Sequence, residues 1–198
     1  MIKRLFGSPE IPKHANVPLP DFLLLANTSV FSETELKRIF SRYINICYDD
    51  GTLSQSRFMY IPELSSCPFA AMAFNYEMEQ EKLNSLYFVH FVRILSKLSP
   101  KTTPVVKVEY MFNVMKINQL DKSSLSKNEV LSMLKNLNGG SIPLSVLDKI
   151  IHKIWDNIIS QSGDKENDIF SSDAGISKAV LTSHLCSLDL QNFVTVQF

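Results

Sequence analysis

The chain is 198 residues long, which is enough for one large domain or two small lobes. Hydrophobic residues make up 45% of the sequence and charged residues 20%, so the chain can bury a core and does not have the composition of a disordered protein. Its 20 basic and 20 acidic residues cancel, which excludes the strongly basic surface of a nucleic-acid-binding protein or of a polybasic membrane-binding segment.

The cysteines and the N-terminal sequence bear on the compartment. The cysteines Cys47, Cys67 and Cys186 are widely spaced, and an odd number of such thiols is typical of a reduced, cytosolic protein. The N-terminus lacks the apolar segment of a signal peptide, and its longest apolar run, residues 22–26, is too short to span a bilayer. We expect a cytoplasmic protein with no direct membrane insertion, which would be peripheral at a membrane through its partner.

The first expected elements are an arm and a helix. Several prolines in residues 1–30 predict an irregular N-terminal arm. A helix is expected to begin after Ser32, because Ser32 and Glu35 have the spacing of a capping box. The apolar face of this helix comprises Leu36, Ile39, Phe40 and Tyr43.

An acidic turn and a short extended segment follow this helix. The turn is Asp49-Asp50-Gly51, and the extended segment is Thr52-Leu53-Ser54. A second helix is expected to begin near Ser54 and to include Phe58. A helix, an acidic glycine turn, a very short strand and a second helix form the outline of an EF-hand.

The same outline recurs along the chain. A helix at 69–76, a polar loop at 77–85 and a helix from 86 to 98 are expected to form the second unit. The third unit combines an apolar helix that begins near Val108 with a loop at 118–126.

Two further features complete the repeat. Ser126 and Glu129 form a second capping box, before the helix that closes the third unit. The fourth unit begins with a strongly amphipathic helix at 146–159, has a short extended segment at 176–177, and ends in an alternating, strand-like run at 193–198.

Four helix–loop–helix units along one chain constitute an internal repeat. We therefore predict an all-α fold of two lobes, each a pair of EF-hands, with short strands that pair the loops. The predicted domains are an irregular proline-containing arm at 1–30, an N-lobe at 31–99, a linker at 100–107, and a C-lobe with a C-terminal strand at 108–198.

The order and spacing of several short motifs resemble those of the calcineurin B homologous proteins and, more widely, of the calcineurin B-like EF-hand family. The run Ile61-Pro62-Glu63-Leu64, after the first loop, is the most specific of these motifs. The other matching motifs are Phe31-Ser32, Ser41-Arg42-Tyr43, Gly51-Thr52-Leu53-Ser54, Phe58, Pro68, Leu86-Tyr87-Phe88 with Phe91, Phe112, Leu125-Ser126, Glu129, and the stretch from Ile176 to Phe198.

The resemblance implies two EF-hand pairs around a hydrophobic cleft that holds an amphipathic helix of a partner protein. In the family this helix is the juxtamembrane helix of a sodium/proton exchanger or a helix of a phosphatase catalytic subunit, and the motif at 61–64 favours the exchanger. The residues predicted to line this partner groove are Phe91, Leu95, Met111, Phe112, Met115, Met133, Leu137, Leu147, Ile151, Ile154, Leu185 and Phe193.

The first two loops lack the residues that bind calcium. An EF-hand loop has oxygen ligands at positions 1, 3, 5, 7 and 9 of twelve and a bidentate glutamate at position 12. With Gly51 at position 6, the first loop has Ile46 at position 1 and Arg57 at position 12. With Leu86 at position 8, the second loop has His90 at position 12. An apolar first position and a cation or an imidazole at the last position argue against calcium.

The last two loops are also degenerate. With Leu125 at position 8, the third loop has Lys122 at position 5, although it is the least degenerate. With Ile176 at position 8, the fourth has Ile169 at position 1 and Val180 at position 12. If any loop binds a metal ion, its ligands are expected to be Asn118, Ser124, Ser126 and Glu129. We expect no cofactor, calcium included, whereas the family usually retains calcium in its C-terminal lobe.

The sequence contains no nucleophile elbow, phosphate-binding loop or zinc-protease motif, so we predict a non-catalytic protein. The predicted function is that of a regulatory or accessory subunit, whose EF-hand lobes with degenerate loops hold a partner's amphipathic helix. The alternative is a calcium sensor or buffer that binds the ion through the third or fourth loop. Only the alternative predicts a calcium-dependent change in the fluorescence of Trp155.

Overall fold

The computed structural model describes residues 17–116, 124–137, 142–161, 176–179, 182 and 195. By their internal contacts the residues divide into two compact units. Unit 1 is Met1–Thr102 with Thr195–Phe198, and unit 2 is Thr103–Val194. The predicted lobe boundaries, 31–99 and 108–198, stay predictions.

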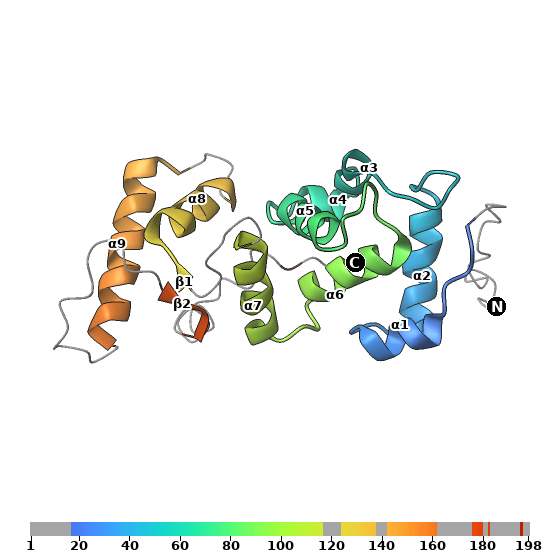
Figure 1. Cartoon of the computed structure of the whole chain (residues 1–198), viewed down its shortest axis with the longest axis horizontal. Helices are drawn as coiled ribbons and strands as arrows, with labels where there is room; N and C mark the ends of the chain where they lie inside the picture. Colours follow the sequence, from blue (N-terminus) through green and yellow to red (C-terminus); the bar gives the residue numbers. More distant parts are fainter. Residues whose placement is uncertain are drawn as a thin grey trace, which may run out of the picture. The chain divides into compact units, whose positions relative to one another are not determined.

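Unit 1 is helical (Figure 1). Its main helix, α2, begins where the capping box was expected, because the Ser32 hydroxyl accepts from the Glu35 N–H and a Glu35 carboxylate oxygen accepts from the Ser32 N–H at 2.9 Å. The helices of the unit are α1 (Phe22–Thr28), α2 (Glu33–Ile44), α3 (Gln55–Met59), α4 (Pro62–Ser65), α5 (Ala70–Gln80) and α6 (Phe88–Leu98).

Within the predicted irregular arm, residues 1–30, the described structure differs at helix α1, residues 22–28. The Asp21 carboxylate caps α1 by accepting a hydrogen bond from the Leu24 N–H at 3.0 Å. Leu25 is buried, and the Phe22 ring meets the Phe40 ring edge-on, with ring centroids 5.7 Å apart. The prolines precede the cap, so they do not prevent the helix from forming behind it.

Two other helix boundaries differ from the prediction. Helix α5 continues to Gln80, four residues beyond the predicted end at Tyr76, because Glu77 is buried and ion-paired within the fold rather than part of a polar loop. Helix α7 begins at Pro104, inside the predicted linker, where proline is favourable because the first helical N–H has no partner within the helix.

Aromatic side chains fill the core of unit 1. The Tyr43 ring packs against Phe88 and Phe91, with centroids 5.2 and 5.3 Å apart. Phe58 meets both Phe74, at 5.2 Å, and Phe91, at 6.0 Å. These rings come from α2, α3, α5 and α6, so the core holds together the helices on both sides of the first two loops.

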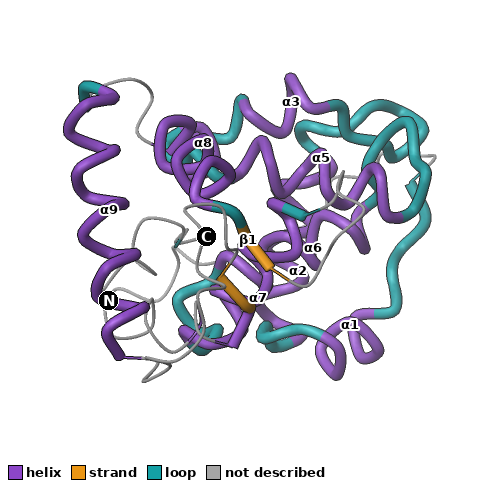
Figure 2. The backbone as a smooth tube through the Cα atoms, turned by 60° about the vertical axis from the view of Figure 1, so that its left-hand side comes forward, coloured by secondary structure: helices purple, strands orange, loops and turns teal. Residues whose placement is uncertain are grey.

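The other helices and the strands of the described residues belong to unit 2. Its elements are α7 (Pro104–Met115), β1 (Ser124–Leu125), α8 (Lys127–Leu137), α9 (Leu144–Gln161) and β2 (Ile176–Ser177). Strands β1 and β2 lie side by side and pair in antiparallel fashion (Figure 2). Helix α9 packs against α8 and buries Leu147, Ile151 and Trp155. The predicted terminal strand at 193–198 lies outside the described residues except for Thr195, which is not in a strand.

The predicted fold class is confirmed, because the described chain is largely helical and its short strands pair loops. None of the helices in the described ranges is both long and apolar enough to pass through a bilayer.

The Glu35 carboxylate provides a test of unit 1 by pH. Its hydrogen bonds with the Lys101 ammonium, at 2.6 and 2.7 Å, and with Ser32 lower its pKa from 4.5 to about 2. A lowered carboxyl pKa stabilises the folded state above pH 4.5, and this contribution is lost as pH falls towards 2. Because the pair is partly exposed, Glu35→Gln should lower the free energy of unfolding at neutral pH by less than about 1 kcal/mol.

Urea unfolding at pH 6 and pH 3 measures this effect. The difference in the free energy of unfolding between wild type and Glu35→Gln should be smaller at pH 3. Wild type begins to lose the charge of Glu35 as the pH falls, whereas glutamine has no charge to lose and still accepts the capping hydrogen bond. Glu33→Gln is the control, since Glu33 makes a looser ion pair, with its oxygen 3.6 Å from the Lys37 nitrogen. An equal difference at both pH values would contradict the prediction.

Candidate functional site

The first two loops are joined through their backbones. Leu53 and Leu86 are fully buried and exchange N–H to C=O hydrogen bonds of 2.8 and 3.0 Å. Both residues were placed at position 8 of their loops, which is where paired EF-hand loops contact each other. Gly51, placed at position 6, has a φ of +77°, the left-handed conformation that the sharp turn requires. The observed pairing therefore agrees with the positions assigned to both loops.

The third and fourth loops pair in the same way. Leu125 lies opposite Ile176, and Ser124 opposite Ser177. Leu125 and Ile176 are also the residues placed at position 8. Ile169 and Asp173, which fall in the fourth loop, and Val180, placed at its position 12, lie outside the described residues.

Arg57 occupies position 12 of the first loop and reaches back to the start of that loop. Its guanidinium nitrogen Nη1 donates to the Ile46 carbonyl at 3.1 Å and to the Cys47 carbonyl at 2.7 Å. The guanidinium carbon lies 3.7 Å from the centroid of the Tyr48 ring, a cation–π distance. A cation thus holds backbone oxygens at positions 1 and 2 of the loop.

The rest of the first loop is closed by internal hydrogen bonds. An Asp50 oxygen accepts from the Thr52 N–H at 3.0 Å and from the Thr52 hydroxyl at 2.7 Å. These two bonds lower the pKa of Asp50, which keeps the carboxylate charged and directed at its own loop. The Tyr48 N–H also donates to the Thr52 carbonyl at 2.8 Å.

Tyr43 connects the first loop to the second from within the core. Its hydroxyl lies 2.7 Å from the Gly51 carbonyl oxygen and 3.0 Å from that of Leu86. The side chain is completely buried, and the loss of solvent raises the pKa of the phenol, so it stays a neutral donor. Sequence reasoning assigned Tyr43 to an apolar helix face and to a family motif, and it missed this contact.

The second loop contains a different ion pair. Arg93 on α6 donates to the Glu77 carboxylate at 3.0 Å and to the Glu81 carboxylate at 2.9 Å. Burial raises the pKa of Glu77, whereas the hydrogen bond from Arg93 lowers that of exposed Glu81. His90, at position 12, accepts from the Tyr87 N–H at 3.4 Å through Nδ1, and burial lowers its pKa.

In the third loop, Glu129 retains the carboxylate expected at position 12, but this group has a protein partner. The Lys116 ammonium lies 2.9 and 3.0 Å from its two oxygens. One oxygen also accepts from the Ser126 N–H at 2.6 Å. Burial alone would raise the pKa of Glu129, but the hydrogen bonds from Lys116 and Ser126 lower it overall. The side chains of Lys116 and Glu129 are only 5% and 17% exposed.

In the first three loops, basic side chains of the chain contact groups at or near the calcium-ligand positions. Arg57 holds loop carbonyls in the first loop, and the carboxylates of Glu81 and Glu129 already bind basic side chains in the second and third. Ser124 and Ser126 are half-buried, whereas Asn118 lies outside the described residues. Among the residues that the structure describes, no three His, Cys, Asp or Glu side chains gather as metal ligands.

Some of the residues predicted to line the partner groove belong to unit 1 and others to unit 2. Phe91 and Leu95 are buried in unit 1, where Phe91 touches Tyr43 and Phe58, so Phe91 belongs to the core. In unit 2, the buried groove residues are Met111, Phe112, Leu147 and Ile151, and Met115 is half-buried. The side chains of Met133, Leu137, Ile154, Leu185 and Phe193 lie outside the description. The groove therefore stays a prediction.

Sequence reasoning missed the basic side chains that engage the loops. It noted Arg57 only as a residue unsuited to calcium, and it did not identify Arg93 or Lys116. A signal was present for two of them, because Arg57 stands at the ligand position itself and Lys116 lies two residues before the third loop. Arg93 lies beyond the loop, and only the fold brings it to Glu77.

The paired loops and their flanking helices define the chain as an EF-hand protein. No protein-family model matches its sequence. The chain is similar to the type 1 calcineurin B subunit of Dictyostelium discoideum, with 30% identity over 146 residues that cover 73% of this chain and 78% of the relative. The calcineurin B subunit of Naegleria gruberi is 25% identical over 168 residues, or 84% and 88% of the two chains. That of Schizosaccharomyces pombe is 28% identical over 132 residues, or 66% and 73%.

The chain therefore belongs to the calcineurin B-like EF-hand family, as its motifs predicted. The relatives are named as B subunits of calcineurin, and the protein is accordingly a non-catalytic, regulatory-type member of the family.

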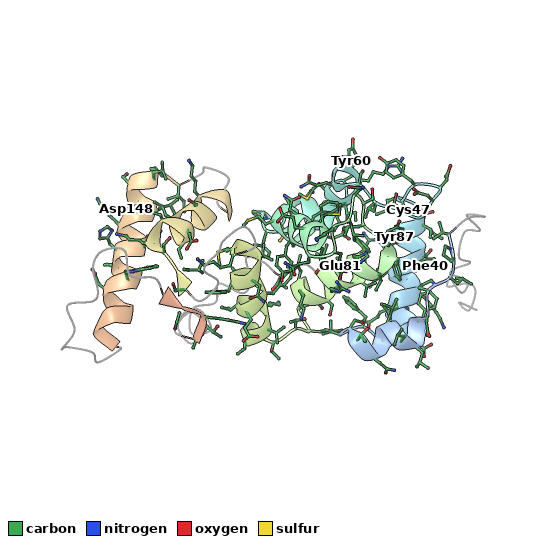
Figure 3. All side chains as sticks on the ribbon, viewed as in Figure 1. Phe40, Cys47, Tyr60, Glu81, Tyr87 and Asp148 are labelled. Atoms are coloured by element: carbon green, nitrogen blue, oxygen red, sulfur yellow. The ribbon has the colours of Figure 1, made fainter. Side chains whose placement is uncertain are left out.

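Removing the Tyr43 hydroxyl should weaken the joined loops. Tyr43→Phe keeps the ring in the core but removes the donor that the buried Gly51 carbonyl uses. An unsatisfied buried acceptor costs about 1–3 kcal/mol, so the free energy of unfolding in urea should fall by that amount. The control is Tyr60→Phe, because Tyr60 is 87% exposed and points away from the helices (Figure 3). Equal stability of the two variants would contradict this role for Tyr43.

Proposed function

We propose that this protein is a calcium-independent regulatory subunit that binds an amphipathic helix of a partner protein. The observation that carries the proposal is the ion pair between Lys116 and Glu129. The bidentate glutamate is the ligand on which EF-hand affinity depends most, and here both of its oxygens face an ammonium group. A calcium ion would have to displace a cation that is covalently part of the chain.

The family supports a role as a subunit. The relatives carry names that make them one component of calcineurin, and the groove residues predicted from the sequence suit an apolar helix. These names favour a helix of a phosphatase-type catalytic chain as the first partner to test. The juxtamembrane helix of a sodium/proton exchanger, favoured by the motif at 61–64, is the second. Either partner is consistent with a cytoplasmic protein, peripheral at a membrane in the second case.

Calcium independence distinguishes this proposal from a calcium sensor or buffer. In a sensor, calcium ligation opens the helix pair and exposes the groove. In this protein the loops are closed by their own side chains, so the groove would be available to its partner at any calcium concentration. A partner that binds only the folded protein would also stabilise it.

Calorimetric titration with calcium after chelator treatment tests the proposal. We expect no heat of binding and no change in the emission of Trp155, which is 8% exposed on α9 and would report a rearrangement of unit 2. An EF-hand protein with intact loops serves as the positive control. Saturable binding with a shift in Trp155 emission would contradict calcium independence and favour the sensor.

A second titration tests the partner. Synthetic amphipathic helices from a phosphatase catalytic subunit and from an exchanger should be compared, each with chelator and with calcium. We expect at least one helix to bind with the same affinity in both conditions, because binding of the helix is not coupled to binding of calcium. Failure of both helices to bind would contradict the role as a helix-binding subunit.

A further inference from the structure

In a calcium-loaded EF-hand, the ion is a mechanical link as well as a ligand. It binds oxygens near the start of the loop and the bidentate carboxylate at position 12, so it joins the helix that enters the loop to the helix that leaves it. A loop that has lost its ligands would lose this link and be free to separate its helices, unless another group replaced it.

In the first loop, Arg57 makes such a link. It lies on α3, the leaving helix, and its guanidinium donates to the carbonyls of Ile46 and Cys47, two and three residues beyond the end of α2, the entering helix. The direction of charge is reversed relative to calcium ligation, since the cation now comes from position 12 and the oxygens come from the backbone. The apolar side chain of Ile46 is no obstacle, because the contact uses its carbonyl. The Tyr48 ring covers the guanidinium and limits its freedom.

In the third loop, Lys116 and Glu129 make the link with the opposite polarity. Lys116 caps the end of α7, which enters the loop, and Glu129 lies in the first turn of α8, which leaves it. The ammonium contacts both carboxylate oxygens, and the Ser126 N–H supplies a further donor. Both side chains are largely buried, so solvent screens this pair far less than it screens a surface ion pair.

In the second loop, Arg93 makes the link. It lies on α6, the leaving helix, and binds Glu77 in the last turns of α5, the entering helix, together with Glu81 at the start of the loop. Glu77 is 4% exposed in its side chain, so its charge depends on the arginine for compensation. The three links differ in their residues and in which helix carries the cation. Each of them joins the end of the helix that enters a loop to the helix that leaves it.

We propose that Arg57, Arg93 and Lys116 are built-in cations that replace the calcium ion as the link between the two helices of the first, second and third EF-hands. The proposal rests on the calcium independence proposed above and adds the groups that take over from the ion. The two helices of each of these EF-hands stay linked at every calcium concentration, because the cation that links them is part of the chain and cannot dissociate.

Ordinary ion pairs elsewhere in the fold provide a matched control. Arg42 and Glu63 are 2.8 Å apart in unit 1, a distance similar to those of the links, but this pair joins α2 to α4 at the surface, with side chains 46% and 32% exposed. Arg42→Met therefore removes an arginine–glutamate contact that joins α2 to α4 rather than the two helices flanking a loop.

Amide hydrogen exchange in the presence of chelator tests the proposal on the full chain. Arg57→Met and Arg93→Met should each speed exchange of the Leu53 and Leu86 amides, which join the two loops, by roughly tenfold or more, because local opening becomes easier. Lys116→Met should do the same for the Leu125 amide in β1. Arg42→Met should leave all three rates within about twofold of wild type.

Two additional variants keep the test decisive if a methionine variant fails to fold. Arg57→Lys keeps the charge but loses the fork of donors, and Glu129→Gln keeps a hydrogen-bond acceptor but loses the charge. In each of these variants the amide exchange rate should lie between that of wild type and the faster rate expected for the methionine variant. Exchange rates equal to wild type in the folded link variants would overturn the proposal, as would an equal increase in Arg42→Met.

The calcium response separates this proposal from the proposed function. Adding calcium should not slow exchange in the link variants, since the missing ligands are not restored. If wild type binds no calcium but the link variants exchange normally, the built-in cations are disproved and calcium independence stands. If wild type binds calcium in these loops, both proposals fail.

Discussion

The two hydrogen bonds between Leu53 and Leu86 fix how the first two loops lie against each other. Neighbouring groups in unit 1 hold this contact in place. The Tyr43 hydroxyl donates to backbone carbonyls of both loops, those of Gly51 and Leu86, and the aromatic core packs the flanking helices together. Because both leucines are fully buried, their backbone groups have no water to replace a lost partner.

Ion pairs within the chain also stabilise the loops. Calcium-binding loops gather carboxylates that repel one another until the ion neutralises them. Here the carboxylates of Glu77, Glu81 and Glu129 face basic side chains of the same chain. Burial raises the pKa of Glu77, so loss of solvent is the larger effect on this carboxyl group. The hydrogen bonds from Lys116 and Ser126 outweigh burial at Glu129 and lower its pKa.

Local signals made much of the fold predictable. The capping boxes at Ser32 and Ser126 marked helix starts, and the loop positions assigned from Gly51 and Leu125 agree with the observed strand pairing. Such features depend on residues within a few positions of one another, which a sequence displays directly. Helix α1 was missed because the arm was predicted from its prolines alone, and the capping residue Asp21 was not considered.

The candidate site was less predictable, for a physical reason. The contact from Arg57 to the Cys47 carbonyl spans ten residues, and that from Arg93 to Glu77 spans sixteen. Contacts of this range exist only once the helices pack. A sequence shows that a ligand is missing, but not which group has taken its place. The predicted groove has the same difficulty, because Phe91 has a helical apolar pattern whether it faces a partner or the core.

We expect the loops to be ordered without a metal ion. The most direct test is amide hydrogen exchange of the wild-type protein at Leu53 and Leu86, measured once in chelator and once in excess calcium. Strong and equal protection of both amides in the two conditions is the predicted result. Protection that appears only when calcium is added would show that the ion still closes these loops, and would contradict calcium independence.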